Sequence, residues 1–333
     1  MDLAGDHGVR RRRMNRALLV GIDHYENFND LSGCVNDAEA MLPLLERNED
    51  ASRNIDCKVL SAASTTAGRV DRAMLDQNID KLLGPGADFA LLYFAGHGDA
   101  AHNDVTLVTT DGTSTAPGIR FTEVLEKIQR SKVAEVVVVL DCCYSGGAGN
   151  VPAIGGGAVL RPGVSILAAS RPDQLSAELD GRGAFSQHLE GALAGGAADV
   201  LGQVTVAGLY AYVSESFDAW NQRPTFKANI ERLHVLRQCR AAVGLDMLRE
   251  LPKWFPTPHY EFPLDPTYEP DAGPDHVHLE HEGVFAGLQI CRAAKLVEPV
   301  GFEHMYFAAM NSGVCRLTPL GRHYRHMAAE GNL

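Results

Sequence analysis

A thiol and an imidazole each follow a strongly apolar stretch of this chain. Val136–Leu140 leads to the adjacent cysteines Cys142 and Cys143. A second apolar stretch ends at His97, which lies between two glycines. A histidine beside a cysteine can take the thiol proton, and the resulting thiolate is a strong nucleophile. The sequence therefore predicts a Cys–His nucleophilic pair, provided that the two stretches are neighbouring strands.

An acyl-transfer reaction at such a pair also needs donors for the oxyanion. The backbone N–H groups of Gly98 and Cys143 are the candidates, and losing one such donor costs about 2.7–4 kcal/mol of barrier. Each residue has a structural alternative, because buried cysteines often only pack and a loop histidine is more often structural. The setting that the two residues share, after a strand and near glycine, favours catalysis. The residues alone do not choose between Cys142 and Cys143.

Apolar β-type stretches alternate with segments of helical periodicity up to about residue 240. Strands are expected at Arg16–Asp23, Lys58–Ser61, Ala87–Phe94, Ala134–Leu140 and Val164–Ala169. Helices are expected at residues 36–47, 67–83, 121–129, 183–194 and 204–217, and residues 225–236 fit a strand or a strand-to-helix mixture. This alternation predicts a doubly wound α/β fold, with a mainly parallel sheet between helix layers and a site at the carboxyl ends of the central strands.

The composition changes after about residue 240. We expect a disordered basic tail over residues 1–14, a first domain over 15–240, a proline-rich connector over 241–275, and a small C-terminal domain over 276–333. The prolines exclude a single helix or a central strand for the connector. The last segment is expected to be mainly helical, in an order that distantly resembles a winged helix. From Gly244 to Leu333 the chain holds seven Lys and Arg against twelve Asp and Glu, and this acidic balance favours protein docking over DNA binding.

The overall charge and the cysteine pattern exclude several classes of protein. The formal net charge of −12 argues against nucleic-acid binding as the main activity. Seven scattered cysteines, without a CxxC pair, indicate reduced thiols and a cytoplasmic location. No apolar run reaches the length of about 18 residues that a membrane span needs, so no membrane association is expected. The N-terminal residues lack the apolar core of a signal peptide.

One tract is dense in histidine, from His276 to Glu282. As a zinc site it lacks a convincing partner pair of ligands, so a solvated loop is the favoured interpretation. A zinc-dependent hydrolase that uses this tract remains an alternative function.

Four ordered stretches resemble the caspase-like cysteine peptidases, and specifically their metacaspase branch. Tyr93–Gly98 and Asp141–Gly146 are similar to the histidine and cysteine motifs of that family. Its first strand and the loop that follows are similar to Val20–Tyr25 with Leu31–Ala38. The start of its small subunit is similar to Ser165–Ser170, with Ala177, Glu178 and Gly183–Ser186. Together they cover roughly residues 16–237. The resemblance implies a caspase-like three-layer α/β/α sandwich.

The resemblance also implies an activity. It places the nucleophile on Cys143, leaves Cys142 as a neighbour, and makes His97 the partner base. It implies a cysteine endopeptidase that cleaves proteins after Arg or Lys, in a regulated pathway of the antiviral-defence or cell-death type. The alternative is a non-catalytic caspase-fold scaffold or partner-binding module, against which the retained cysteine and histidine argue.

The resemblance assigns the substrate's P1 pocket to Asp37, Asp141, Cys34 and Ala95, the last standing where the family often has serine. Two carboxylates in a partly enclosed pocket favour a cationic P1 side chain, and arginine can bind both. From the residues alone, Asp37 is equally well a helix cap, and Asp141 a strand-end residue that accepts hydrogen bonds.

Many metacaspases bind calcium through adjacent aspartates at a helix start. Here Ile119–Glu123 occupies that region, with Glu123 as its one acid and Arg120 nearby. We therefore expect no metal and no cofactor, and expect activation by a protein partner through the C-terminal domain. For internal processing, Arg182–Gly183 is the better candidate bond, because Arg161 precedes proline.

Overall fold

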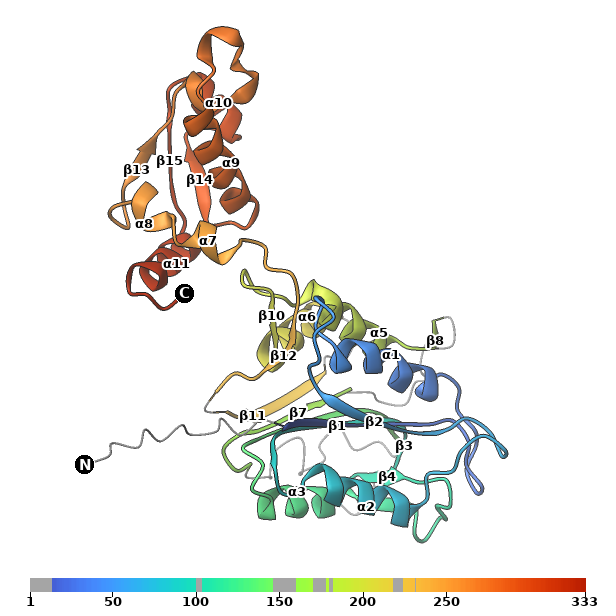
Figure 1. Cartoon of the computed structure of the whole chain (residues 1–333). Coiled ribbons are helices and arrows are strands. Elements are labelled where there is room, and N and C mark those ends of the chain that lie inside the picture. Colours follow the sequence, from blue (N-terminus) through green and yellow to red (C-terminus); the bar gives the residue numbers. More distant parts are fainter. Residues whose placement is uncertain are drawn as a thin grey trace, which may run out of the picture. The chain divides into compact units, whose positions relative to one another are not determined.

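The chain forms two compact units. The computed structural model describes residues 14–99, 104–145, 160–169, 178–179, 182–217, 224–230 and 232–333, apart from the side chains of 143–145 and 178–179. The second unit consists of residues 199–202 and 240–333, and the first unit of the remainder (Figure 1). The expected tail lies outside the described residues, except that Met14 begins the first strand.

The first unit is built on an eight-stranded mixed sheet. Its main path runs β11–β7–β6–β3–β1–β2, in which all pairs from β7 to β2 are parallel and β11 is antiparallel to β7. These strands are β1 (Met14–Ile22), β2 (Asp56–Ala62), β3 (Ala87–Asp99), β6 (Glu135–Ser145), β7 (Val164–Ala168) and β11 (Thr225–Asn229). Two short strands, β4 (Thr106–Val108) and β5 (Gly118–Arg120), extend the sheet at the carboxyl end of β3. The predicted mainly parallel sheet is confirmed.

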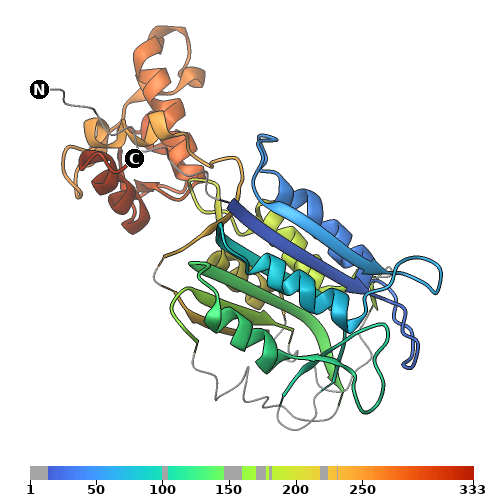
Figure 2. The ribbon, with the colours of Figure 1, turned by 60° about the horizontal axis from the view of Figure 1, so that its bottom comes forward.

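Helices cover both faces of this sheet (Figures 1 and 2). One face carries α1 (Cys34–Glu46), α5 (Ala184–Gly191) and α6 (Val206–Ser216), and the other carries α2 (Arg72–Leu82) and α3 (Phe121–Arg130). This is the predicted three-layer sandwich. The remaining elements are the π-helical turn η1 (Ala192–Gly196), the pair β10 (Gln203–Thr205) with β12 (Val235–Gln238), and the pair β8 (Glu178–Leu179) with β9 (Arg182–Gly183).

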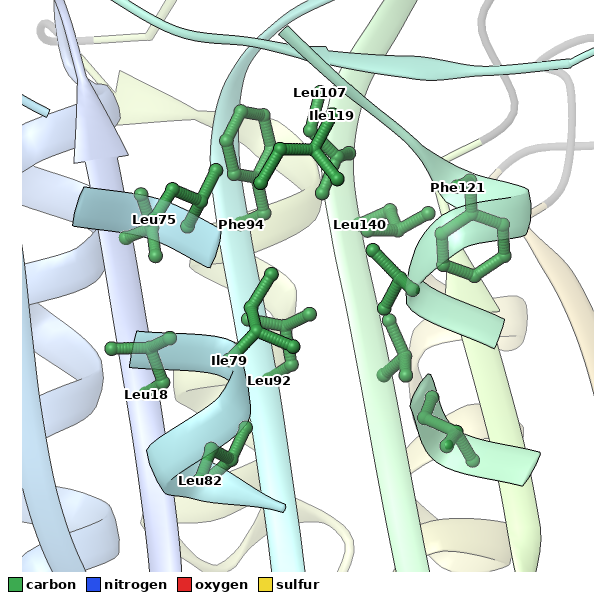
Figure 3. Close-up of a cluster of buried hydrophobic side chains, with 14 of the residues drawn as sticks. Leu18, Leu75, Ile79, Leu82, Leu92, Phe94, Leu107, Ile119, Phe121 and Leu140 are labelled. Atoms are coloured by element: carbon green, nitrogen blue, oxygen red, sulfur yellow. The ribbon is translucent and has the colours of Figure 1, made fainter. Parts of the chain in front are cut away.

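Strands β3 and β6 are buried on both faces because their alternate residues enter two different cores. Phe94 and Leu140 pack in a cluster with Ile79 of α2 (Figure 3). Residues of opposite parity face the other helix layer, where Tyr93 packs in a cluster with Met41 of α1. The central strands therefore appear in the sequence as continuous apolar runs and not as alternating ones.

The second unit packs helices against a three-stranded antiparallel sheet of order β13–β15–β14. Its strands are β13 (Glu261–Pro263), β14 (Val297–Val300) and β15 (Val314–Leu317). Its helices are α7 (Leu245–Leu248), α8 (Leu251–Trp254), α9 (Leu279–Ala293), α10 (Met305–Met310) and α11 (Pro319–Ala329), with 3₁₀ turns η2 (Pro266–Tyr268), η3 (Pro270–Ala272) and η4 (Pro274–His276). Within residues 240–333, all of which are described, α10 separates β14 from β15, so these strands do not form the hairpin of a wing.

The proline-rich segment 241–275 differs from the extended connector that the sequence predicts. It is part of the second unit, and its side chains Phe255 and Leu264 are buried in that unit's core. The prolines fit because of where they stand: Pro252 lies in the first turn of α8, and Pro263 ends the edge strand β13. Both are positions where the missing proline N–H costs little.

No helix among the described residues is both long enough and apolar enough to cross a membrane.

Gly21 of β1 lies against the start of α1 and provides a direct test of this packing. A Cβ at position 21 would lie 2.4 Å from the carbonyl oxygen of Cys34 and 2.8 Å from Cα of Val35. We expect Gly21→Ala to lower the melting temperature of the first unit by several degrees in scanning calorimetry, because overpacking costs about 1–3 kcal/mol. Gly244→Ala is the matched control, since a Cβ there meets nothing within 4 Å. Equal melting temperatures for the two variants would contradict the close approach.

Candidate active site

The pairing of β3 with β6 brings the predicted residues to one edge of the sheet. In the parallel register, His97 is the partner of Cys143, and Ala95 is the partner of Asp141. The backbone of Cys143 belongs to β6, whereas its side chain lies outside the described part of the structure. The predicted neighbourhood of the two strand ends is therefore confirmed at the level of the backbone. The catalytic roles of the two residues stay predictions.

Cys142 belongs to the interior of the fold. Its side chain is buried and lies in the same apolar cluster as Phe94 and Leu140. This placement agrees with the packing role that was predicted for Cys142.

The imidazole of His97 is oriented by a backbone carbonyl. Its Nε2 lies 2.8 Å from the carbonyl oxygen of Asn29, which can only accept a hydrogen bond. In the neutral imidazole, Nε2 therefore carries the proton and Nδ1 carries the lone pair that can take a proton from a thiol. The pattern of side chains in the sequence could not reveal Asn29, because the group it contributes is a backbone carbonyl.

Tyr25 contacts both the backbone and the ring of the same histidine. Its hydroxyl accepts a hydrogen bond from the His97 N–H at 2.8 Å and donates one to the carbonyl oxygen of Ile22 at 3.1 Å. The two rings are in contact, with their centroids 4.7 Å apart. Burial raises the pKa of Tyr25 well above its usual value, although the hydrogen bond from His97 acts in the opposite direction. The hydroxyl therefore stays protonated, so it can accept the hydrogen bond from His97 and donate the one to Ile22 at the same time.

Gly96 has a packing role that the sequence did not predict. A Cβ at this position would lie 2.7 Å from the hydroxyl oxygen of Tyr25 and 3.2 Å from the ring of Phe94. Glycine is needed here so that Tyr25 can reach the backbone of His97.

The four residues predicted for the P1 pocket are gathered beside this edge. Asp37 and Asp141 are both buried, and Ala95 lies beside Asp141 in the sheet. Burial raises the pKa of Cys34 well above its usual value, and the nearby carboxylates of Asp23, Asp141 and Asp37 raise it further. The Cys34 thiol is thus held in its neutral form beside these carboxylates. The substrate-binding roles of the four residues stay predictions.

Asp141 accepts a hydrogen bond from a serine that the sequence analysis did not single out. The Ser186 Oγ of α5 donates to Asp141 Oδ2 at 2.5 Å and lies 2.6 Å from the Tyr93 hydroxyl. Tyr93 is fully buried, and this burial raises its pKa well above the usual value. The hydroxyl chain fixes the carboxylate of Asp141 at the end of β6.

Asp37 is held by an arginine of the same chain. Arg182 Nε donates to Asp37 Oδ1 at 2.9 Å, and the Gly183 N–H donates to Oδ2 at 3.0 Å. Burial raises the pKa of Asp37 to about 6, against the opposing effects of Gly183 and Arg182. Arg182 also reaches Glu190, with 2.5 Å between Nη1 and Oε2. The sequence had suggested Arg182 only as a processing site, and no local pattern marks it as a partner of Asp37.

The predicted oxyanion donors lie in the paired part of the sheet. Gly98 stands between two strands, opposite Leu107 of β4 and Tyr144 of β6. The role of the Gly98 and Cys143 N–H groups stays a prediction.

The residues at the family's calcium region do not fit a metal ion. Glu123 is paired with both Arg72 and Arg120, each at 2.9 Å, and so its charge is already balanced. Asp104 accepts hydrogen bonds from Val105 and Thr122 at the start of α3. Among the described residues, no group of three or more His, Cys, Asp or Glu side chains could hold a metal.

Two histidines of the histidine-dense tract stack against each other and against a tyrosine. His278 and His281 stack with their centroids 3.7 Å apart, and His281 stacks in turn on Tyr268 at 4.2 Å. His281 Nδ1 also lies 2.6 Å from the hydroxyl of Thr267. These contacts leave the zinc-hydrolase alternative without a ligand set in the described residues.

Comparison with known proteins supports the arrangement of the first unit. A family model described as a caspase domain matches residues 14–234. The match ends before the second unit begins its main segment at residue 240. No curated protein matches the chain.

The Tyr25 hydroxyl provides a test of how His97 is held. In Tyr25→Phe, the partly buried N–H of His97 and the buried carbonyl of Ile22 both lose a partner. Leaving a buried group of this kind unsatisfied costs about 1–3 kcal/mol. We expect urea denaturation to show a free energy of unfolding lower by about that amount. Tyr260→Phe, at an exposed tyrosine of the second unit, is the control and should leave the value unchanged. A Tyr25→Phe variant as stable as the wild type would refute the supporting role.

Proposed function

The chain belongs to the caspase-domain family of cysteine peptidases, and we propose that it is an endopeptidase that cleaves proteins after Arg or Lys. The observation that carries this proposal is the register of β3 with β6, which makes His97 the partner of Cys143. The contact of His97 with the Asn29 carbonyl supports it further, because it leaves Nδ1 with the lone pair.

In the proposed reaction, His97 transfers one proton in each of two steps. Its Nδ1 accepts the thiol proton of Cys143 while its Nε2–H remains on the carbonyl oxygen of Asn29. The thiolate attacks the carbonyl carbon of the scissile bond, and backbone N–H groups of Gly98 and Cys143 receive the developing oxyanion. The imidazolium then donates its proton to the leaving amine. His97 then deprotonates a water molecule, whose oxygen attacks the thioester carbon; the C–S bond breaks, the acid product leaves, and His97 returns the proton to the sulfur of Cys143.

We assign the preference for Arg or Lys to the buried carboxylates Asp37 and Asp141. Because Asp37 is already paired, a cationic P1 side chain has to replace Arg182 there. Glu190 offers Arg182 a second carboxylate to which it can remain bound when it leaves Asp37. The pocket therefore has a competing cation built into it, and the cost of displacing Arg182 reduces the affinity for substrate.

The second unit is the proposed route of regulation. It lies outside the family match, and we assign to it the binding of a protein activator. A pathway of the defence or cell-death type is an analogy with the family. The second candidate function is a non-catalytic partner-binding module, which the pairing of Asp37 with Arg182 favours because it holds one pocket carboxylate.

Two adjacent cysteines allow a matched test of the nucleophile. We expect wild-type protein to cleave a fluorogenic peptide with Arg at P1, and Cys143→Ala to abolish the cleavage. Cys142→Ala should retain it, since Cys142 is a buried packing residue. Circular dichroism checks that both variants fold. Equal loss in both variants would reject Cys143 as the nucleophile, and a wild type that cleaves neither Arg nor Lys peptides would favour the non-catalytic module.

The pKa of Asp37 predicts a specific pH dependence of P1 recognition. The quantity to measure is the ratio of kcat/KM for two peptides, one with Arg at P1 and one with its neutral isostere citrulline. The titration of the Cys–His pair cancels in this ratio. We expect the ratio to fall as the pH drops through about 6, because protonation removes the negative charge of Asp37.

One pH unit below that value, the preference for Arg should be about tenfold smaller, since the ionised fraction falls by that factor. In Asp37→Asn, the ratio should be low and independent of pH over the same range. A wild-type ratio that stays constant with pH would show that Asp37 does not face the P1 cation.

A further inference from the structure

One face of α9 in the second unit is apolar and exposed along its whole length. This face, called the α9 stripe below, consists of Leu279, Gly283, Ala286, Ile290 and Ala293. Leu279 is 82% exposed and Ile290 is 43% exposed. The opposite face of the helix is buried, with Phe285 and Leu288 in the core of the unit. The apolar stripe is therefore additional to the face that α9 needs for folding.

The spacing of the stripe is that of a helix–helix interface. Its residues follow one another at intervals of four, three, four and three, which is the pattern of the a and d positions of a heptad. At Gly283, a Cβ would meet nothing within 4 Å, so no described atom of the chain lies over this point of the helix. Small residues at three of the five positions allow another backbone to come close. A contiguous exposed apolar surface of this kind marks a protein interaction site.

We propose that the α9 stripe binds the α9 stripe of a second copy of this chain, with the two helices antiparallel. A twofold axis at Ala286 brings Leu279 of one copy opposite Ala293 of the other. The same axis brings Ile290 near Gly283. Each large side chain thus meets a small one, and the stripe is complementary to itself, as a twofold interface requires.

The order of large and small residues along the stripe selects the antiparallel arrangement. In a parallel pair, Leu279 would face Leu279 and Gly283 would face Gly283, so that the large side chains would collide while the small residues left a gap. The helix dipoles favour the same arrangement, because each positive N-terminus then lies beside a negative C-terminus.

Two exposed aromatic side chains of α10 lie near the side chain of Arg292, which belongs to the last turn of α9. Arg292 Nη2 lies 3.4 Å from His304 Nδ1, and the His304 ring lies 6.0 Å from that of Phe307 in α10. Tyr306 and Phe307 are 41% and 48% exposed. Stable interfaces bury at least about 1,200 Å², and the stripe is a single face of one helix, with five residues of which three are small. We therefore expect a weak dimer whose population depends on concentration.

The oligomeric state of the full chain tests this directly. In sedimentation velocity over a range of protein concentrations, wild-type protein should shift from monomer to dimer. Ile290→Glu should weaken the dimer by at least about tenfold, as expected when a charge enters the centre of an apolar interface. Leu320→Glu on α11 is the matched control, because Leu320 is 42% exposed and lies off the stripe. It should leave dimerisation unchanged.

Gly283→Leu is a second variant, chosen so that a loss of dimer cannot be attributed to misfolding. Open space surrounds position 283, so the substitution should leave the fold of the unit intact while keeping the two helices apart.

A positive test of the twofold axis uses Ala286→Cys with diamide as oxidant. The two introduced thiols, related by the axis, lose two protons and two electrons to diamide and form one disulfide between copies. Ala329→Cys, at an exposed alanine of α11, controls for random collisions.

The expected result is a covalent dimer for Ala286→Cys well above the wild-type and Ala329→Cys backgrounds. A wild type that stays monomeric at every concentration would overturn the inference. So would a dimer that Ile290→Glu and Gly283→Leu leave unchanged, since the stripe would then face a different partner. These outcomes are independent of the proposed peptidase activity, because neither measurement uses a substrate.

Discussion

The site depends on the parallel hydrogen-bonded pairing of two strands, β3 and β6. That register makes His97 the partner of Cys143 and Ala95 the partner of Asp141, although the two strands are far apart in the sequence. A shift by one residue would turn the side chains of one strand to the opposite face and separate the pair. The register is held in turn by the two cores, because the alternate residues of both strands are buried on opposite sides of the sheet.

The sequence was sufficient for those parts of the structure that leave a local pattern. Apolar runs such as Val136–Leu140 predicted the central strands, and the glycine-flanked His97 pointed to the edge where the site lies. The residues that were missed contribute through groups without a local signal. Asn29 acts through its carbonyl oxygen, and Arg182 reaches Asp37 across 145 positions of the chain. The proline-rich segment 241–275 was misjudged because prolines at a first helical turn and on an edge strand exclude less structure than their number suggests.

Burial has two opposing effects on the carboxylates Asp37 and Asp141 beside the strand ends. Burial makes the carboxylates strong ligands for a cation, because charges interact more strongly at low dielectric. The same burial raises the pKa of Asp37 to about 6 and calls for a compensating charge, which Arg182 provides. In the proposed P1 pocket, these carboxylates favour a cation, and one of them is already paired with the chain's own Arg182. The α9 stripe lies in the second unit, so the proposed association and the proposed recognition of the P1 residue can be tested by separate mutations.

The most direct test of the central claim is to identify the atom that reacts with a substrate analogue. A peptidyl chloromethyl ketone with Arg at P1 forms a stable thioether with a nucleophilic thiol that lies beside a bound P1 residue. After incubation and digestion, mass spectrometry locates the modified residue. The predicted result is one adduct per chain, on Cys143, which is lost in His97→Ala. An adduct on Cys142, or efficient labelling only by the analogue with Asp at P1, would contradict the assignment of the nucleophile or of the pocket.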